Sequence, residues 1–212
     1  MQLKYSWTLA WQPTGRSAIM AEIYHLRMTE VIVLDPAVGH LLALAYALLF
    51  VHASWLKWLD LRRFTATLVN YRLLPAPLPA LLGKIIPVLE TGAAGALLYG
   101  PVRILGVTIG AVLLLIYAAA IGTNMARGRL DLDCGCTGPA GRRPIALWMV
   151  VRNIVLAGGL VSLAAPWIGR PLVAVDGLTI SGGACVLVLL YLSMDTLFAQ
   201  LLPAVDRLKV PL

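Results

Sequence analysis

Apolar side chains follow one another in five long runs along this chain, and polar residues gather in the short segments between the runs. Each run holds about 20 residues, which at 1.5 Å per residue matches the roughly 30 Å of hydrocarbon that a spanning helix must cross. The runs cover residues 37–59, 78–102, 104–126, 145–167 and 178–202. The pattern therefore predicts five transmembrane helices.

The segments between these runs are short, so consecutive helices must be neighbours in one bundle. We predict an all-α integral membrane protein, an antiparallel bundle of about five transmembrane helices with a four-helix core plus one. The bundle forms one domain at 37–205, and residues 206–212 are a short C-terminal tail. Residues 1–36 mix charged and apolar side chains, which predicts an N-terminal interfacial amphipathic segment.

Glycine pairs inside the runs are expected to mark close helix contacts, because small residues let membrane helices approach one another. The pairs are Gly92 with Gly95, Gly106 with Gly110, and Gly158 with Gly159.

Composition supports the membrane assignment. The chain is 60% hydrophobic and only 13% charged, with a mean hydropathy of +0.85, which is unlike an ordinary soluble domain. We attribute the net charge of +7 to loops that attract anionic lipid, and we exclude a soluble role in nucleic-acid binding. The protein is expected to be a multi-pass protein of the cell inner (cytoplasmic) membrane, with the lipid bilayer as its surroundings.

Two of the three cysteines, Cys134 and Cys136, stand in the sequence DCGC, within a polar loop predicted at 127–144. Cysteines two residues apart can form a tight disulfide, and the intervening Gly135 tolerates the unusual dihedral angles that such a ring needs. Arginines on both sides of the pair favour the reactive thiolate. We therefore expect an accessible pair whose disulfide is labile, as catalytic and regulatory disulfides are.

Two other interpretations of the cysteine pair stay open. Two thiolates suit Cu(I) or part of a zinc site, but zinc usually takes four ligands, and the sequence has no second cysteine pair or histidine cluster. The pair can also be structural. Thiol–disulfide chemistry is preferred, so no metal ligand is assigned. Cys185 is predicted near the opposite face, too far away to bridge with the pair, as a small apolar packing residue.

Ionisable residues also fall within the predicted spans. His52, Glu90, Arg152 and Asp195 all lie, by their depth along the helices, in the middle of the membrane or nearer the DCGC loop. Because charges in hydrocarbon normally face the bundle interior in pairs, we predict a polar pocket below the loop. Arg152 is expected to pair with Glu90 or Asp195, and such a pair can also serve only to fix helix register. Lys57 is expected to extend to the lipid headgroups.

Several separated stretches occur in a recognisable order. They are HASWLKWLDLRRF at 52–64, NYRLLP at 70–75, IPVLE ending at Glu90, NMARG at 124–128, DCGC at 133–136, and Trp148 followed by Arg152 and Asn153. Together they resemble the MauE family, membrane proteins of methylamine utilisation operons that are grouped with DoxX-like proteins. That family is distantly similar to the four-helix bundle of vitamin K epoxide reductase. DCGC followed by a helical Arg-Asn pair is the most specific part of the resemblance.

The resemblance implies an accessory role in maturation of an exported, disulfide-rich client, such as a methylamine dehydrogenase-type subunit, beside a thioredoxin-fold partner. Cys134 and Cys136 would exchange thiols with that partner, while Arg152, Asn153 and Glu90 shape the pocket beneath. The alternative from a different class is a non-catalytic assembly or structural subunit, with metal binding by the loop as one variant.

The epoxide reductase pattern has a second cysteine pair in its first loop, and the corresponding segment at 60–77 contains no cysteine. The counterpart for thiol exchange must then be another protein. A quinone near the mouth of the fourth helix is the candidate electron carrier, and no other cofactor is assigned.

Loop charge and redox chemistry disagree about the side of the membrane on which the DCGC loop lies. The loops on its face, with the C-terminus, hold ten Lys and Arg residues against five on the other face, and the positive-inside rule then favours the cytoplasm. Exported disulfides require the opposite side, because cytosolic reductants keep thiols reduced. Since four of the ten charges flank the cysteines, where they can serve thiolate chemistry, we favour the exported face.

Overall fold

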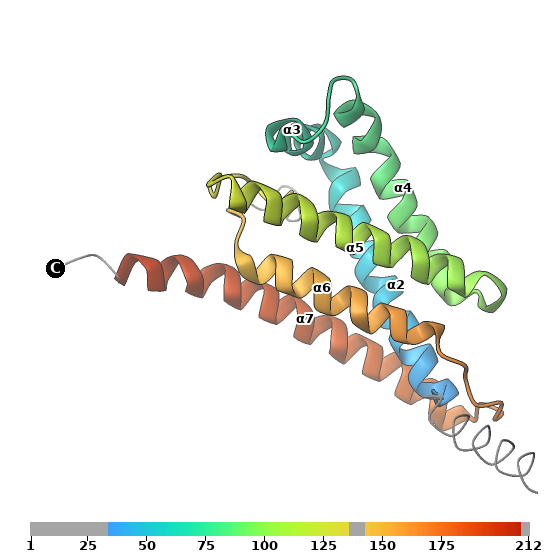
Figure 1. Cartoon of the computed structure of the whole chain (residues 1–212). Helices are drawn as coiled ribbons and strands as arrows, with labels where there is room; N and C mark the ends of the chain where they lie inside the picture. The colour runs from blue at the N-terminus through green and yellow to red at the C-terminus, as the bar shows by residue number, and fades with distance from the viewer. Residues whose placement is uncertain (1–33, 136–142, 209–212) are drawn as a thin grey trace, which may run out of the picture. The chain divides into compact units, whose positions relative to one another are not determined.

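The structure is a computed structural model that describes residues 34–135 and 143–208 (Figure 1). The predicted interfacial segment at 1–36 therefore lies almost wholly outside the described residues, and so does Cys136. The chain from Leu34 to Leu212 forms one compact unit.

Five helices in the described part of the chain are long and apolar enough to cross a membrane. They are α2 (Pro36–Leu59), α4 (Leu78–Leu98), α5 (Arg103–Ala126), α6 (Leu147–Val161) and α7 (Ala174–Leu208). Two short 3₁₀ turns, η1 (Gly100–Val102) before α5 and η3 (Ser162–Ala164) after α6, complete the spans. The all-α membrane fold predicted from the apolar runs is confirmed.

The connection between α2 and α4 contains a helix that the apolar runs do not reveal, α3 (Leu61–Tyr71). It begins at Asp60, whose side chain accepts a hydrogen bond from the N–H of Arg63 at 3.0 Å, as N-caps do. It buries Phe64, Thr67 and Tyr71, which share one face because they are three and four residues apart. With this face α3 packs over the end of the bundle that lies near the DCGC loop.

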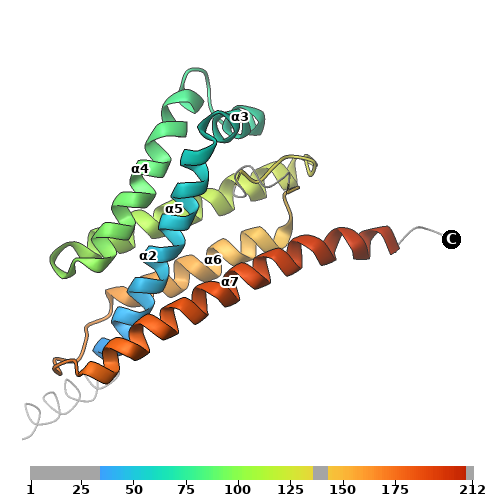
Figure 2. The ribbon, with the colours of Figure 1, turned by 180° about the vertical axis from the view of Figure 1, so that it is seen from behind.

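The arrangement is a four-helix core with one helix added, as predicted. Within the core, α2 packs against α4, α4 against α5, and α5 against α6. The fifth helix, α7, packs mainly on α2. Both views show α7 running alongside α6 (Figures 1 and 2), yet few residues of these two helices come close together. The backbones of α6 and α7 therefore do not approach closely, and the two helices meet through long side chains.

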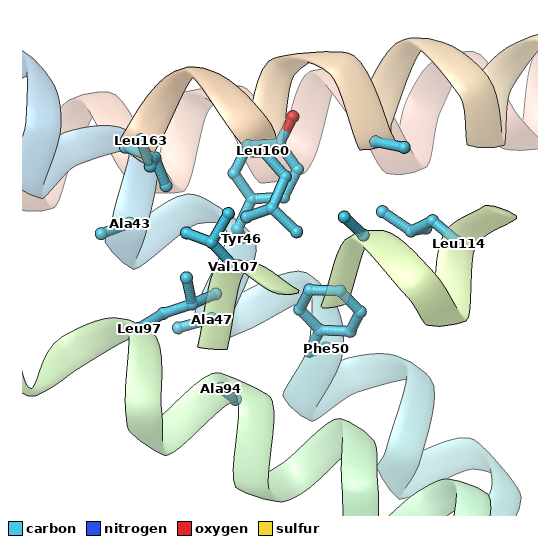
Figure 3. Close-up of a cluster of buried hydrophobic side chains, with 12 residues drawn as sticks. Ala43, Tyr46, Ala47, Phe50, Ala94, Leu97, Val107, Leu114, Leu160 and Leu163 are labelled. Carbon is cyan, nitrogen blue, oxygen red and sulfur yellow. The ribbon is translucent and has the colours of Figure 1, made fainter. Parts of the chain in front are cut away.

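The buried core draws side chains from all four core helices (Figure 3). Tyr46 and Phe50 of α2 pack with Leu97 of α4 and Leu160 of α6, and the Tyr46 hydroxyl donates a hydrogen bond to the carbonyl of Leu156 at 2.9 Å. This packing fixes the rotation of α2 about its own axis. Because side chains three and four residues apart share a helix face, the next turns of α2 also direct their side chains into the bundle.

Close helix contacts occur at half of the predicted glycines. A methyl group at Gly106 would lie 2.7 Å from the backbone nitrogen of Leu97, so α4 and α5 touch backbone to backbone there. Gly110 and Gly159 are also closely covered, by Phe50 and Tyr46. The prediction is wrong for Gly92, Gly95 and Gly158, which have no described neighbouring atom within 4 Å of an added methyl group.

At the end of the bundle away from the DCGC loop, Arg170 joins the α6–α7 connection to the start of α2. Its guanidinium donates to both carboxylate oxygens of Asp35 at 2.8 and 2.9 Å, and also to Asp176. These hydrogen bonds, with one from the N–H of Ala37, hold the pKa of Asp35 below its ordinary value. The starts of α2 and α7 are thus tied together, which sets the position of α7 against the core.

Candidate functional site

The two ends of the DCGC loop that the structure describes pair with each other. The N–H of Cys134 donates to the carbonyl of Arg143 at 3.0 Å, and the N–H of Ile145 donates to the carbonyl of Leu132 at 3.0 Å. Asp133 and Pro144 form an antiparallel bridge between these two bonds. The pairing fixes the backbone on which Cys134 stands.

Asp133 anchors this paired segment to α3. One of its carboxylate oxygens accepts hydrogen bonds from the Arg63 guanidinium at 2.8 and 3.2 Å. The other accepts weaker ones from the N–H groups of Gly135 at 3.4 Å and Arg143 at 3.3 Å. A single carboxylate therefore ties both sides of the loop to the helix that covers the bundle. Nothing in the sequence pattern identified Asp133 as this anchor.

Gly135 occupies a position that other residues would strain. Its φ is +71°, in the left-handed region that favours glycine, as predicted from its place between the cysteines. A methyl group there would also lie 3.1 Å from Cγ2 of Thr67 and 3.4 Å from Cδ2 of Phe64. The loop can approach α3 this closely because the residue between the cysteines has no side chain.

Cys134 is buried, with 9% of its surface exposed, and packs with Tyr71, Ile121, Ile145 and Met149. The expectation of an accessible cysteine is wrong for Cys134, because the segment that carries Cys134 and Gly135 packs against α3 and α5. Cys136 lies outside the described residues. The third cysteine, Cys185, is a free thiol on the exposed side of α7.

A cavity of about 170 Å³ lies directly against Cys134 and Gly135. Its walls are mostly Leu, Ile and aromatic side chains of α3, α4 and α5, and Lys57 and Tyr117 also line it. An apolar protein cavity of about 150 Å³ accommodates benzene. The space beside Cys134 is thus large enough for one six-membered ring, and Lys57 and Tyr117 are among the hydrogen-bonding side chains in its wall.

Lys57 does not reach the headgroups, contrary to expectation. It is only 5% exposed, and its ammonium contacts the two carboxylate oxygens of Glu90 at 2.7 and 2.9 Å. Glu90 is 1% exposed and also accepts a hydrogen bond from the Tyr117 hydroxyl at 2.7 Å. Lys57 follows Tyr46 and Phe50 on the inward face of α2, so its side chain extends toward Glu90 and not toward the membrane surface.

A second, polar cavity of about 100 Å³ brings together the residues that the sequence placed in a common pocket. All five line it: His52, Glu90, Arg152, Asn153 and Asp195. Lys57 and Tyr117 line this cavity as well as the one beside Cys134, so they form part of the wall between the two.

The pairing of Arg152 follows one of the two predicted alternatives. Its guanidinium bonds Asp195, while Glu90 bonds Lys57. The same Asp195 carboxylate also binds Arg143, which comes from the DCGC loop. The loop is consequently tied to α6 and α7 through Asp195 and to α3 through Asp133.

Asn153 is 3% exposed, and its side-chain nitrogen has no hydrogen-bond partner among the described residues. A buried donor of this kind costs free energy unless an acceptor reaches it. His52, at the edge of the same cavity, is largely exposed. The polar cavity therefore offers a place for an oxygen atom of water or of a ligand.

Lys57, Tyr117 and Arg63 also belong to this site and were not predicted from the sequence. Tyr117 could have been identified, since it is the one aromatic residue in the span at 104–126 and stands near its middle. For the metal alternative, the part of the chain that is described brings no three His, Cys, Asp or Glu side chains together as ligands.

Comparison with known proteins identifies relatives of the chain. The family model described as Methylamine utilisation protein MauE matches residues 35–167. The chain is 34% identical over 168 residues to Methylamine utilization protein MauE of Methylophilus methylotrophus, covering 78% of this chain and 88% of that one. It is 33% identical over 131 residues to the protein of the same name from Paracoccus denitrificans, covering 62% and 70% of the two chains. No solved structure matches.

The Lys57–Glu90 pair predicts a stability test. Lys57→Met leaves Glu90 buried without its counter-charge, which should lower the free energy of unfolding by about 3–5 kcal/mol. The double variant Lys57→Met/Glu90→Gln removes both charges and should recover most of this loss. Unfolding of the purified protein in detergent measures the effect, with Lys84→Met as the control, because Lys84 is an exposed lysine of α4. Equal effects of Lys57→Met and Lys84→Met would contradict the buried pair.

Proposed function

The chain belongs to the MauE family of methylamine utilisation proteins, and we propose that it is a membrane accessory protein for thiol–disulfide exchange. Its client is an exported, disulfide-rich protein of the methylamine dehydrogenase subunit type, reached through a thioredoxin-fold partner. The observation that carries the proposal is the placement of Cys134. The Asp133 carboxylate and the pairing with Arg143 hold this cysteine against a ring-sized cavity, a costly arrangement for a residue that serves only to pack.

The two cysteines have different roles in the proposed exchange. Cys134 is buried beside the cavity, so exchange with a protein partner is assigned to Cys136. A thiolate of the partner attacks the sulfur of Cys136 in the Cys134–Cys136 disulfide. The S–S bond breaks, a mixed disulfide forms, and Cys134 leaves as a thiolate. A second thiolate of the partner then attacks the mixed disulfide, so the partner becomes oxidised and the pair is left as a dithiol.

A quinone is the electron carrier that suits the cavity beside Cys134. One ring fits its volume, and the Lys57 ammonium in its wall is a donor that can bond a quinone oxygen, since its contact with the carbonyl of Ala53 is long, at 3.5 Å. When bound, a quinone would supply the capacity to accept two electrons and two protons from the dithiol. Lys57 would orient the ring, Tyr117 would line the space with its hydroxyl kept on Glu90, and the Leu and Ile side chains around the ring would exclude water. We place the quinone here instead of at the mouth of α6, because this cavity touches Cys134.

The local bonds of the loop arginines bear on the side of the membrane on which the DCGC loop lies. Arg129 bonds the carbonyls of Asn70 and Tyr71, Arg63 bonds Asp133, and Arg143 bonds Asp195. These cations serve local structure, so they are weak evidence for a cytoplasmic loop under the positive-inside rule. We propose that the protein spans the cell inner membrane with the DCGC loop on the exported face, where disulfides persist.

Replacement of the cysteines tests the proposed exchange. In cells whose own copy is deleted, Cys134→Ser and Cys136→Ser should each reduce the disulfide-bonded client by at least about tenfold, because neither variant can form the disulfide. Cys185→Ser should match the wild type, since Cys185 lies exposed on α7. Client disulfides are counted by thiol alkylation and mass spectrometry. Normal client from a double Cys134→Ser/Cys136→Ser variant would instead support an assembly or structural role.

Blocking the cavity tests the place of the quinone. Ala120 lines the cavity beside Cys134, whereas its neighbour Ala119 on α5 is exposed. Ala120→Phe should slow oxidation of the reduced protein by a soluble benzoquinone by about tenfold or more, and Ala119→Phe should leave the rate unchanged. Quinol formation under anaerobic conditions gives the rate. An undiminished rate in a folded Ala120→Phe protein would remove the quinone from this cavity.

A further inference from the structure

A groove of about 760 Å³ lies between α6 and α7, whose backbones do not approach closely. Its walls are almost entirely apolar and include Val151, Val155 and Met194. Trp148 of α6 and Phe198 of α7 stack at the groove, with their ring centroids 5.7 Å apart. A hydrocarbon chain is the natural occupant of such walls in a membrane, because lipid tails are as apolar as these side chains.

One end of the groove carries positive charge. Arg152 and Asp195 line it, and Arg143 binds the same Asp195 carboxylate from the DCGC loop. Two guanidinium groups therefore share this one carboxylate. The Arg152 guanidinium carbon also lies 4.9 Å from the centre of the Trp148 ring, which holds the charge beside the aromatic wall.

The start of α6 lies at this same end. Its N-cap residue, Ala146, has no side chain that can accept a hydrogen bond from the first turn, and Ala146 and Leu147 line the groove. The first N–H groups of a helix lack partners within the helix and favour anions. The charged end of the groove thus gathers two arginines and one uncapped helix start.

The groove lies next to the polar cavity. The two spaces share Arg152, Leu156, Tyr191 and Asp195 in their walls. Asn153 lines the polar cavity, and its buried side-chain nitrogen has no hydrogen-bond acceptor within the described part of the chain. The arginines of the groove therefore lie beside a space that has a buried donor of its own.

We propose that this groove is a binding site for an anionic phospholipid. The phosphate lies at Arg143, Arg152 and the start of α6, and an acyl chain follows the apolar walls between α6 and α7. From Leu147 to Val155 the groove follows α6 for nine residues, a rise of about 12 Å, which suits the upper part of an acyl chain. The positive end selects an anionic headgroup over a zwitterionic one, since basic pockets between membrane helices bind anionic lipids.

The bound lipid has a direct link to the cysteine loop. Arg143 accepts the N–H of Cys134 with its backbone carbonyl while its side chain reaches Asp195 at the groove. An anionic headgroup on Arg143 therefore stabilises the loop geometry that holds Cys134. The lipid site stands independently of the proposed thiol exchange, because its evidence is the groove and its charges.

Quenching of Trp148 by brominated lipid tests the site. The full chain is reconstituted in phosphatidylcholine that contains an equal mole fraction of either dibrominated phosphatidylglycerol or dibrominated phosphatidylcholine. Subtracting the signal of Trp148→Phe isolates the fluorescence of Trp148. We expect quenching by the brominated phosphatidylglycerol to exceed that by the brominated phosphatidylcholine at least threefold.

Two arginine variants give the matched comparison. Arg143→Gln should bring the ratio of the two quenching effects close to one, because the charge excess at the groove is lost. Arg127→Gln removes the same charge from an exposed position at the end of α5 and should keep the threefold preference. Equal quenching by the two lipids in the wild type would overturn the proposal in favour of ordinary boundary lipid. Absence of quenching by either lipid would overturn it in favour of a protein segment in the groove.

Discussion

A charged side chain buried in the membrane is unfavourable unless an opposite charge lies beside it. In this bundle Lys57 and Glu90 neutralise each other in this way. The two side chains are almost completely buried, and the Tyr117 hydroxyl supplies a further hydrogen bond to the carboxylate. The pair joins α2 to α4, and the tyrosine adds α5. Because breaking such a pair leaves an isolated charge in a medium of low dielectric constant, the three helices are held in one register. The same register creates a wall between the polar cavity and the cavity beside Cys134.

Two further carboxylates hold the DCGC loop against this framework. Asp133 fastens the loop to α3 through Arg63, and Asp195 fastens it to α6 and α7 through Arg143. Cys134 is consequently placed by contacts that come from opposite sides of the bundle. Cys134 held in this way keeps its position relative to the cavity, as the proposed exchange of electrons with a bound ring would require.

The sequence predicts much of this arrangement, for reasons that can be identified. Helices that cross a membrane need long apolar runs, so the five spans can be recognised from the sequence alone. Depth along those spans also groups His52, Glu90, Arg152 and Asp195, which line one cavity, because the depth of a residue in the membrane can be counted along each helix. Asn153 of the same cavity came from the family resemblance. Rotation about the helix axis is harder to predict, because it depends on packing between helices. For this reason Lys57 was expected at the surface. Burial of Cys134 was missed because it depends on α3, a helix with only three buried residues.

The proposed function depends on a disulfide between Cys134 and Cys136 that exchanges on the exported side of the membrane. Labelling of intact cells with a membrane-impermeant maleimide, in a Cys185→Ser background, tests this most directly. We expect Cys136 to be labelled in intact cells only after mild reduction from outside. Labelling that needs permeabilised membranes but no reductant would contradict it, because the thiols would then be reduced and would face the cytoplasm.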